Sequence, residues 1–170
     1  MVSTREGVTQ MLDGAIMEYV KWFIGIVSTV LMAVLVVFMF KLNEMNAFQQ
    51  EVNYQIERHG GLTPAAMAEL DKHAKEAYGG CLAKTAESVA TCVDGTPATE
   101  TSGFFVKEYV VDDAGNKSYY TRPAGQEARY GTQVRYVLTR QIGDVDNLTM
   151  FKPAVIGSSA SRVRGAQPTP

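Results

Sequence analysis

The sequence predicts an α+β protein: a long N-terminal transmembrane helix that continues as an amphipathic stem, then a short helix and a small antiparallel β-sheet domain. Three observations predict it. Residues 22–40 contain no charged side chain. Apolar residues then recur at three- and four-residue steps up to residue 56, as on one face of a helix. From residue 104 onwards, segments rich in β-branched and aromatic residues indicate strands.

The length of 170 residues leaves room for one domain of about 100–150 residues together with an anchor. The net charge of -2 is that of an ordinary soluble protein, but it averages over two very different parts of the chain. We therefore divide the sequence into an N-terminal segment (1–21), a transmembrane helix (22–40), an amphipathic stem helix (41–60), an extracytoplasmic α+β domain (61–157) and a flexible tail (158–170).

The uncharged run from Trp22 to Phe40 is bracketed by Lys21 and Lys41. At about 1.5 Å per residue it nearly covers the roughly 30 Å of a bilayer core. Lysines at such positions extend to the headgroups, and Tyr19 and Trp22 lie where an interfacial aromatic belt is expected. A buried helix of a globular protein fits less well, because no other segment is apolar enough to surround it. A cleaved signal peptide also fits poorly, because no small-x-small site follows the run.

The apolar run continues into a helical stripe rather than ending at a helix breaker. This stripe consists of Leu42, Met45, Phe48, Val52 and Ile56. We expect one helix of about 45 residues that begins near Ala15 and stops at Gly60-Gly61. Such a helix is longer than a small domain requires, so its stripe packs either on the domain or on a neighbouring chain.

A second helix is predicted after Thr63-Pro64, which supplies an N-cap and a proline at the first helical position. Gly79-Gly80 closes it. Its predicted apolar face consists of Met67, Leu70, Ala74 and Ala77. Either this face packs against the stem, or the helix is a weakly amphipathic surface helix.

The last third of the chain predicts a small antiparallel sheet. Strands are expected over 104–111 and 117–122, joined by a turn at 112–116, and over 130–142. A fourth strand over 148–156 contains Pro153, which favours an edge strand or a bulge. The Ser-, Gly- and Pro-rich residues from Gly157 onwards predict a loosely ordered tail.

Cys81 and Cys92 are the two cysteines of the chain. Their spacing in a Gly-, Ser- and Thr-rich stretch favours a disulfide-closed loop and an oxidising compartment. The domain is then extracytoplasmic and the N-terminus cytoplasmic, an orientation that the nearly balanced basic residues beside the span do not set. Two free thiols in a cytosolic domain remain an alternative. A zinc site with His59 and His73 lacks the short Cys-x-x-Cys spacing.

No motif for catalysis is present: the sequence lacks a Gly-rich phosphate loop, an H-E-x-x-H pair and a nucleophile elbow. His59 and His73 have charged neighbours and are expected to face solvent. We predict no enzyme, no catalytic residue, no metal and no cofactor. The basic residues are scattered along the sequence, so nucleic acid is not expected as a partner.

Two clusters of oxygen-bearing side chains leave calcium as an alternative to ordinary turn chemistry. They are Asp112, Asp113 and Asn116, and Asp144, Asp146 and Asn147. A hairpin turn explains the first cluster well, because Asp, Asn and Gly are the residues that such turns favour. The second cluster has the same ambiguity.

Glu18 stands directly before the apolar run, where an unpaired carboxylate is unfavourable unless it stays hydrated or finds a positive partner. One interpretation is an interfacial charge beside Lys21. The other is a charge that pairs with the N-terminal amine or a lysine of an adjacent subunit during assembly.

The segment Gly14-Ala15-Ile16-Met17-Glu18-Tyr19, followed by a long apolar helix, resembles the start of pilins and pseudopilins of the tight-adherence (Tad, type IVc) system. In those families a glycine precedes the cleavage point and a glutamate is usually the fifth residue after it, whereas Glu18 is the fourth residue after Gly14. The resemblance implies processing between Gly14 and Ala15.

Residues 46–52 and 56–61 resemble the polar post-membrane helix of TadE-like proteins, and residues 130–139 and 156–161 are similar to their closing β-segments. The resemblance implies a pilin-like or pseudopilin-like structural subunit of a surface pilus or secretion apparatus, in the cell membrane or in a filament. Its partners would be the bilayer, itself or other pilin-like subunits, a prepilin peptidase and an assembly ATPase. The stripe from Leu42 to Ile56 would make lateral contacts. The alternative is a non-polymerising bitopic accessory subunit of a secretion or conjugation machine, or a membrane-tethered binding module.

Overall fold

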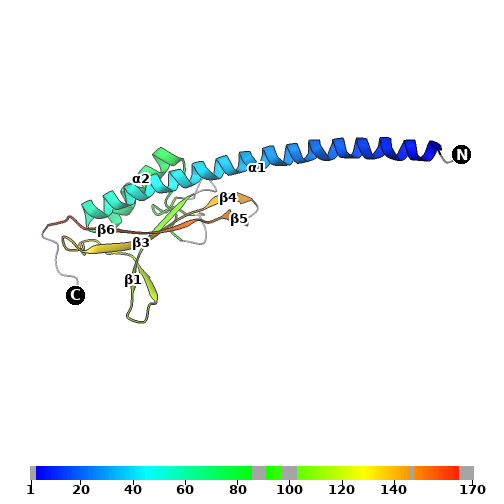
Figure 1. Ribbon diagram of the computed structural model, residues 1–170. Helices are drawn as coiled ribbons and strands as arrows, with labels where there is room; N and C mark the ends of the chain where they lie inside the picture. Colours follow the sequence, from blue (N-terminus) through cyan, green and yellow to red (C-terminus); the bar gives the residue numbers. More distant parts are fainter. Residues whose placement is uncertain (1–2, 86–90, 97–102, 146–147, 165–170) are drawn as a thin grey trace. The chain divides into compact units, whose positions relative to one another are not determined.

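The computed structural model describes residues 3–85, 91–96, 103–145 and 148–164. The chain divides into two compact units, Met1–Asn43 and Glu44–Pro170. Its elements in order are α1 (Ser3–His59), α2 (Pro64–Tyr78), β1 (Phe104–Val111), β2 (Lys117–Tyr120), β3 (Gln133–Arg140), β4 (Ile142–Val145), β5 (Leu148–Phe151) and β6 (Ala154–Ala160) (Figure 1). The predicted α+β class is confirmed.

Helix α1 is longer than predicted, because it begins at Ser3 rather than near Ala15. No proline occurs between residues 3 and 59, and proline is the residue that most strongly interrupts a helix. The predicted end is confirmed: α1 stops at His59, and Gly60 and Gly61 follow with φ of 68° and 136°. By length and composition, the part of α1 from Ile16 onwards is the one candidate membrane span among the described residues.

The second unit is built on a four-stranded antiparallel sheet with the strand order β2-β1-β3-β6. The register sets Val106 opposite Leu138 and Phe105 opposite Thr139. Successive side chains of a strand point to opposite faces. Val106 and Leu138 therefore mark an inner face, which is buried, and Phe105 and Thr139 mark an outer face.

The core lies between the inner face and the two helices, which both lie on one side of the sheet (Figure 1). From α1 it receives four fully or almost fully buried side chains: Met45, Phe48, Val52 and Ile56. The ring of Phe48 stacks on that of Phe104 with 4.1 Å between centroids. The expectation that these four residues contact neighbouring subunits is therefore wrong, because the chain's own sheet covers them. Leu42, the first residue of the predicted stripe, belongs to the other unit.

Helix α2 begins as predicted, with the Thr63 hydroxyl accepting a hydrogen bond from the Ala66 N–H at 3.3 Å and Pro64 at the first helical position. Its buried face is rotated from the predicted one. Ala66, Leu70, Asp71 and Ala74 are buried, whereas Ala77 is exposed. The difference arises because Asp71 accepts a hydrogen bond from the Leu82 N–H at 2.8 Å, which turns a polar residue toward the core.

The segment predicted as one strand over 148–156 is two strands, separated at Lys152-Pro153. Strand β5 pairs with β4 in a two-stranded sheet, whereas β6 pairs with β3 along seven residue pairs. A proline lacks the N–H that a continuous ladder needs, which explains the break.

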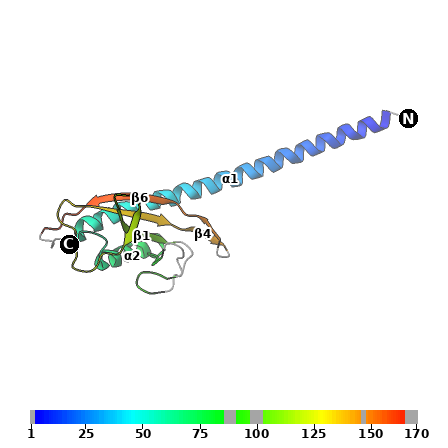
Figure 2. The same ribbon diagram turned by 90° about the horizontal axis from the view of Figure 1, so that it is seen from below.

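The predicted tail from Gly157 is also wrong, because β6 runs to Ala160 and Ser161 is buried. A Cβ atom at Gly157 would overlap the ring of Tyr136 on β3, so the glycine allows this close pairing. Figure 2 shows β6 beside the last turns of α1, where the Arg162 N–H donates to the Glu57 carbonyl at 3.0 Å. Residues 165–170 lie outside the described part of the chain.

Cys81 and Cys92 form the predicted disulfide, with their Cα atoms 5.7 Å apart. The bridge and Ala83 form a small buried cluster against which Phe105 of the outer face packs. Isolated β-bridges, formed by backbone hydrogen bonds, pair Ala83 with Cys92 and Leu82 with Phe104. The disulfide loop is thereby attached to the first strand of the sheet.

Candidate functional site

The strongest polar cluster of the second unit is a buried ion pair between Glu108 of β1 and Arg122. The guanidinium Nη2 lies 2.8 Å from Glu108 Oε2, and both side chains are less than one-tenth exposed. Tyr120 donates its hydroxyl to the same carboxylate at 2.5 Å, and the Leu62 N–H donates to Glu108 Oε1. A Cβ at Gly61 would overlap this pair, so the glycine lets the end of α1 approach it.

This environment shifts the pKa values of Tyr120 and of Arg122 itself. Burial, followed by the hydrogen bond to Glu108 and its charge, raises the pKa of Tyr120 to about 12. Burial by itself lowers the pKa of Arg122, but the hydrogen bonds and charge of Glu108 outweigh it, and the net shift is upward. Arg122 also donates to the Gln126 carbonyl at 3.0 Å. The cluster therefore joins β1, β2 and the segment after β2 to the residues that follow α1, which is a structural role.

A second buried cation, Arg140 of β3, lies where α1 enters the second unit. Its Nη2 is 2.5 Å from Glu44 Oε2 and its guanidinium carbon is 4.5 Å from the centroid of Phe104. Nε and Nη1 of Arg140 have no hydrogen-bond partner within the described ranges. Burial lowers the pKa of Arg140, and the charge of Glu44 opposes that shift. The pair fixes the α1 turn at Glu44 to the sheet.

Both histidines were expected to face solvent, and the structure corrects this. His73 is half-buried and stacks on Phe48, with 6.5 Å between ring centroids, and contacts Tyr78 edge-on. His59 is also half-buried, and its Nε2 has no partner among the described side chains. His73 thus packs against aromatic rings of α1 and α2.

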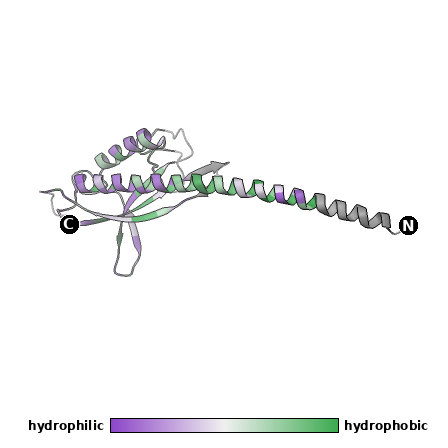
Figure 3. Cartoon of the chain, turned by 45° about the horizontal axis from the view of Figure 1, so that its top comes forward, coloured by the Kyte–Doolittle hydropathy of each residue, from purple (hydrophilic) through white to green (hydrophobic). Residues whose placement is uncertain are grey.

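The N-terminal unit presents an apolar surface on all sides of its helix. From Ile16 to Phe40 almost every large apolar side chain is exposed, and Figure 3 shows the hydrophobic residues that follow one another along this part of α1. Glu18 is exposed at the start of this segment. Gly14 and Ala15 lie within α1, one turn before it.

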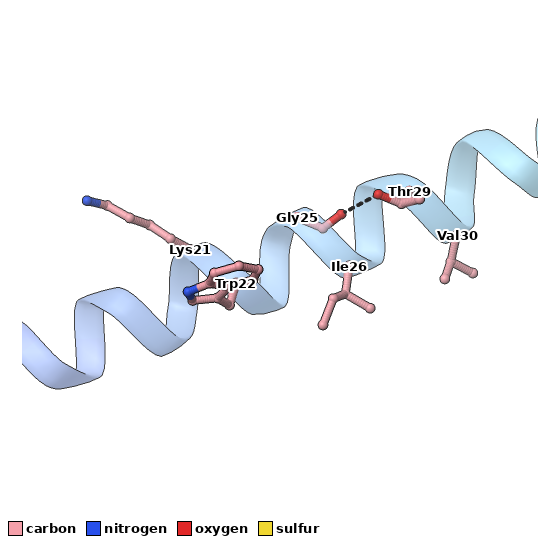
Figure 4. A pocket seen from close by; sticks show the side chains of 6 residues that line it. All are labelled: Lys21, Trp22, Gly25, Ile26, Thr29 and Val30. Carbon is pink, nitrogen blue, oxygen red and sulfur yellow. Dashed lines mark hydrogen bonds between the residues drawn. The ribbon is translucent and has the colours of Figure 1, made fainter.

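A shallow notch interrupts this surface (Figure 4). Two rows of side chains, each with a spacing of four residues, border it: Lys21, Gly25 and Thr29, and Trp22, Ile26 and Val30. The Thr29 hydroxyl donates to the Gly25 carbonyl at 2.9 Å, and no atom occupies the space beside the Gly25 Cα. The notch is therefore a place where another helix can approach the α1 backbone closely.

The outer face of the sheet carries a groove of about 460 Å³. Its lining consists of Lys84, Thr85, Phe105, Lys107, Tyr119, Val137 and Thr139. This groove was missed at the level of the sequence, where basic residues look scattered. The signal that could have found it is the two-residue alternation of β1 and β3, which sets Lys107 and Arg135 on the same side as Phe105 and Val137.

The first candidate calcium cluster is a hairpin turn. Asp112 Oδ1 accepts the Asn116 N–H at 2.7 Å, and the Gly115 N–H donates to the Asp112 carbonyl at 2.9 Å. Gly115 has a φ of 84°, which the turn requires. In the second cluster, Asp146 and Asn147 lie outside the described residues.

Comparison with known proteins gives one relative and no family. An uncharacterized protein of Bacillus anthracis, pXO2-21, is 46% identical over 72 residues, which are 42% of this chain and 60% of that protein. The chain thus spans less than two thirds of the relative's length. No family model and no solved structure matches the chain.

Proposed function

We propose that this protein is a membrane-anchored, pilin-like or pseudopilin-like structural subunit that assembles through the N-terminal half of α1. The observation that carries the proposal is the exposure of almost every large apolar side chain between Ile16 and Phe40, while the later turns of the same helix pack into a folded domain. Exposure of this mostly apolar segment of about twenty-five residues to water is unfavourable, because removing each CH₂ group from water contributes about 0.8 kcal/mol of free energy. Lipid or other subunits must cover them.

Association of such helices in a membrane favours small residues at the contact. Lipid tails are as apolar as leucine, so close packing of backbones and interhelical hydrogen bonds drive association rather than the hydrophobic effect. The notch beside Gly25 and Thr29 supplies such a contact. We therefore assign the assembly surface to residues 16–40. The later residues Met45, Phe48, Val52 and Ile56 are buried in the chain's own core.

Glu18 completes this surface in the proposal. It is exposed one helical turn before Trp22, at the boundary of the apolar segment. In an assembled bundle its carboxylate pairs with the N-terminal amine or a lysine of an adjacent subunit, because a charge beside lipid is stable when it has a positive partner. The N-terminus lies in the cytoplasm, and the disulfide-containing domain lies on the opposite side of the membrane.

The order of the elements supports this proposal through its resemblance to TadE-like proteins, in which an N-terminal apolar helix precedes a small domain. By this resemblance, we expect a prepilin peptidase and an assembly ATPase as partners. A second candidate function is a membrane-tethered binding module or accessory subunit that does not polymerise. The groove on the outer face of the sheet favours it, because that groove is independent of α1 assembly.

The oligomeric state and the N-terminal residue of the protein, measured in cells that produce it, distinguish the two proposed functions. We expect the chain in sheared surface filaments or in crosslinked membrane oligomers, with an N-terminus at Ala15 by mass spectrometry. Glu18→Ala should reduce assembly and leave membrane insertion intact. An intact Met1 in a protein that is monomeric in its membrane contradicts the pilin-like proposal and favours the binding module.

A matched pair of variants tests the helix surface directly. Gly25→Leu fills the notch, whereas Val34→Leu adds bulk nine residues later, which is about 180° around the helix. Both keep the segment apolar, so both should insert into the membrane. We expect Gly25→Leu to lower the oligomer yield more than Val34→Leu; equal yields would remove the notch from the assembly surface.

A further inference from the structure

The outer face of the sheet carries charge of a single sign. Its outward positions along the four strands are Phe105, Lys107, Tyr109, Val111, Lys117, Tyr119, Gln133, Arg135, Val137, Thr139, Ala154, Ile156, Ser158 and Ala160. Three of these residues are cationic and none is acidic. Because the whole chain has a net charge of -2, positive charge is concentrated on this face.

Within this face, the groove combines two ammonium groups with apolar surface and an unused hydroxyl. Neither Lys84 nor Lys107 has an ion-pair partner among the described residues. Thr139 is 9% exposed, and its Oγ1 is buried without a hydrogen-bond partner there. Phe105 and Tyr119 supply aromatic surface. Buried polar atoms normally have partners, so an acceptor or donor from outside would complete this site.

The same chain presents an acidic protrusion, whose charge is opposite in sign to that of the groove. The turn between β1 and β2 stands out from the sheet (Figure 1), and residues 112–119 are all exposed. Asp112 and Asp113 lie at its tip. The carboxylate of Asp112 fixes the turn by accepting from Asn116, whereas that of Asp113 has no partner within the described ranges.

We propose that the groove at Lys84 and Lys107 of one copy receives the acidic hairpin tip at Asp112 and Asp113 of a second copy. The tip does not reach the groove of its own chain, because β1 and β2 are paired up to Val111 and Lys117. The contact joins two different surfaces and is therefore heterologous, so it repeats from copy to copy and builds either a closed ring or an open filament. This inference rests on the proposed function, since it requires assembled copies.

The groove has a size suited to such a tip. Its volume of about 460 Å³ corresponds to roughly fifteen water molecules at liquid density, enough for several side chains. Charge pairs at the rim of a contact mainly determine its register and specificity rather than its strength. We therefore expect α1 to provide most of the association, and the groove to determine how neighbouring domains are oriented.

The test uses the full-length protein in its membrane and two photocrosslinking positions. The photoreactive residue p-benzoylphenylalanine replaces Tyr119 in the groove in one protein, and Ile26 of α1 in another. Peptide mapping by mass spectrometry then identifies the residues reached. The probe at position 26 reports assembly through α1, and the probe at position 119 reports the groove contact.

Charge reversal identifies the occupant. We expect Lys84→Glu with Lys107→Glu, or Asp112→Lys with Asp113→Lys, to reduce the groove crosslink by roughly fivefold to tenfold. Combining both reversals in one chain should restore it. Lys72→Glu and Glu76→Lys, on the exposed face of α2, are matched controls that should leave it unchanged. Thermal unfolding of each variant verifies that its domain is folded.

Each outcome separates the two hypotheses. Crosslinks from position 26 without any tip residue crosslinked to position 119 would overturn the groove contact and leave the proposed function standing. No crosslink between copies at either position would overturn both. If reversal of the groove weakens its crosslinks but reversal of the tip does not, and the combination does not restore them, the occupant is a different acidic protein and the assignment to a second copy is wrong.

Discussion

The ring of Phe48 on α1 stacks on the ring of Phe104 on β1, with 4.1 Å between centroids and 20° between planes. Both side chains are completely buried. This contact joins the last turns of α1 to the sheet, and it belongs to the core that buries the apolar residues Met45, Phe48, Val52 and Ile56. It also places this part of α1 inside the folded domain.

Replacement of Phe48 should therefore unfold the domain rather than disturb assembly alone. We expect Phe48→Ala to lower the free energy of unfolding by about 3–5 kcal/mol, as is common for buried aromatic residues. Thermal unfolding in detergent, followed by circular dichroism, measures it. Tyr54→Ala on the same helix is the control, because Tyr54 is 54% exposed. Equal midpoints for the two variants would contradict the core described above.

The buried ion pair should be sensitive to the loss of one partner. Glu108→Gln leaves the Arg122 guanidinium buried without its counter-charge, and we expect a loss of about 3–5 kcal/mol of unfolding free energy. The exposed Glu69→Gln on α2 is the control. The double variant Glu108→Leu with Arg122→Met should be more stable than Glu108→Gln. Denaturant titration decides this prediction, and a double variant less stable than the single one would refute it.

The raised pKa of Tyr120 predicts a loss of stability at alkaline pH. The phenol ionises at pH 10 in the unfolded chain and at about 12 in the folded one. Its contribution is therefore fully present below pH 10 and is lost as the pH rises toward 12, since the folded state retains the proton that the unfolded state releases. Thermal midpoints between pH 9 and 12 should fall more steeply for the native protein than for Tyr120→Phe. Parallel curves would remove the effect.

The disulfide should stabilise the second unit by constraining its unfolded state. The two cysteines are separated by eleven positions, and closing a loop of that size contributes roughly 2–3 kcal/mol. We expect Cys81→Ser with Cys92→Ser to lower the thermal midpoint. Labelling of free thiols in intact cells with a membrane-permeant reagent is a second measurement: labelled native protein would contradict the bridge and remove its support for the proposed extracytoplasmic location.

Gly157 lies where the sequence predicted a loosely ordered tail, but it is part of β6, and a side chain at this position should be sterically unfavourable. A Cβ there would overlap the Tyr136 ring, whose hydroxyl donates to Asn53 Oδ1 of α1 at 2.6 Å. Gly157→Ala should lower the midpoint, whereas Ser158→Ala, at an exposed neighbouring position, should not. An unchanged midpoint for Gly157→Ala would show that β6 can move away from the ring.

Local signals in the sequence determined the order of the helices, the end of α1, both ends of α2 and the cysteine pair. They also located three strands, which were predicted over 104–111, 117–122 and 130–142 and are observed over 104–111, 117–120 and 133–140, whereas α1 begins earlier than predicted. Gly60-Gly61, Thr63-Pro64 and Gly79 act on their own turns of backbone, so their effect needs no knowledge of distant residues. The apolar composition of residues 22–40 is local as well, and so is the resemblance at Gly14 to Tyr19.

Only the tertiary structure decided what the stripe from Met45 to Ile56 contacts, how the chain divides at Pro153, and which residues share the outer face with Lys107. Each depends on pairing between segments far apart in the chain, such as β3 with β6 or Phe48 with Phe104. A helical period shows that a face is apolar, but several partners can cover it equally well. The strand register selects among them, because a shift by one residue would exchange the inner and outer faces.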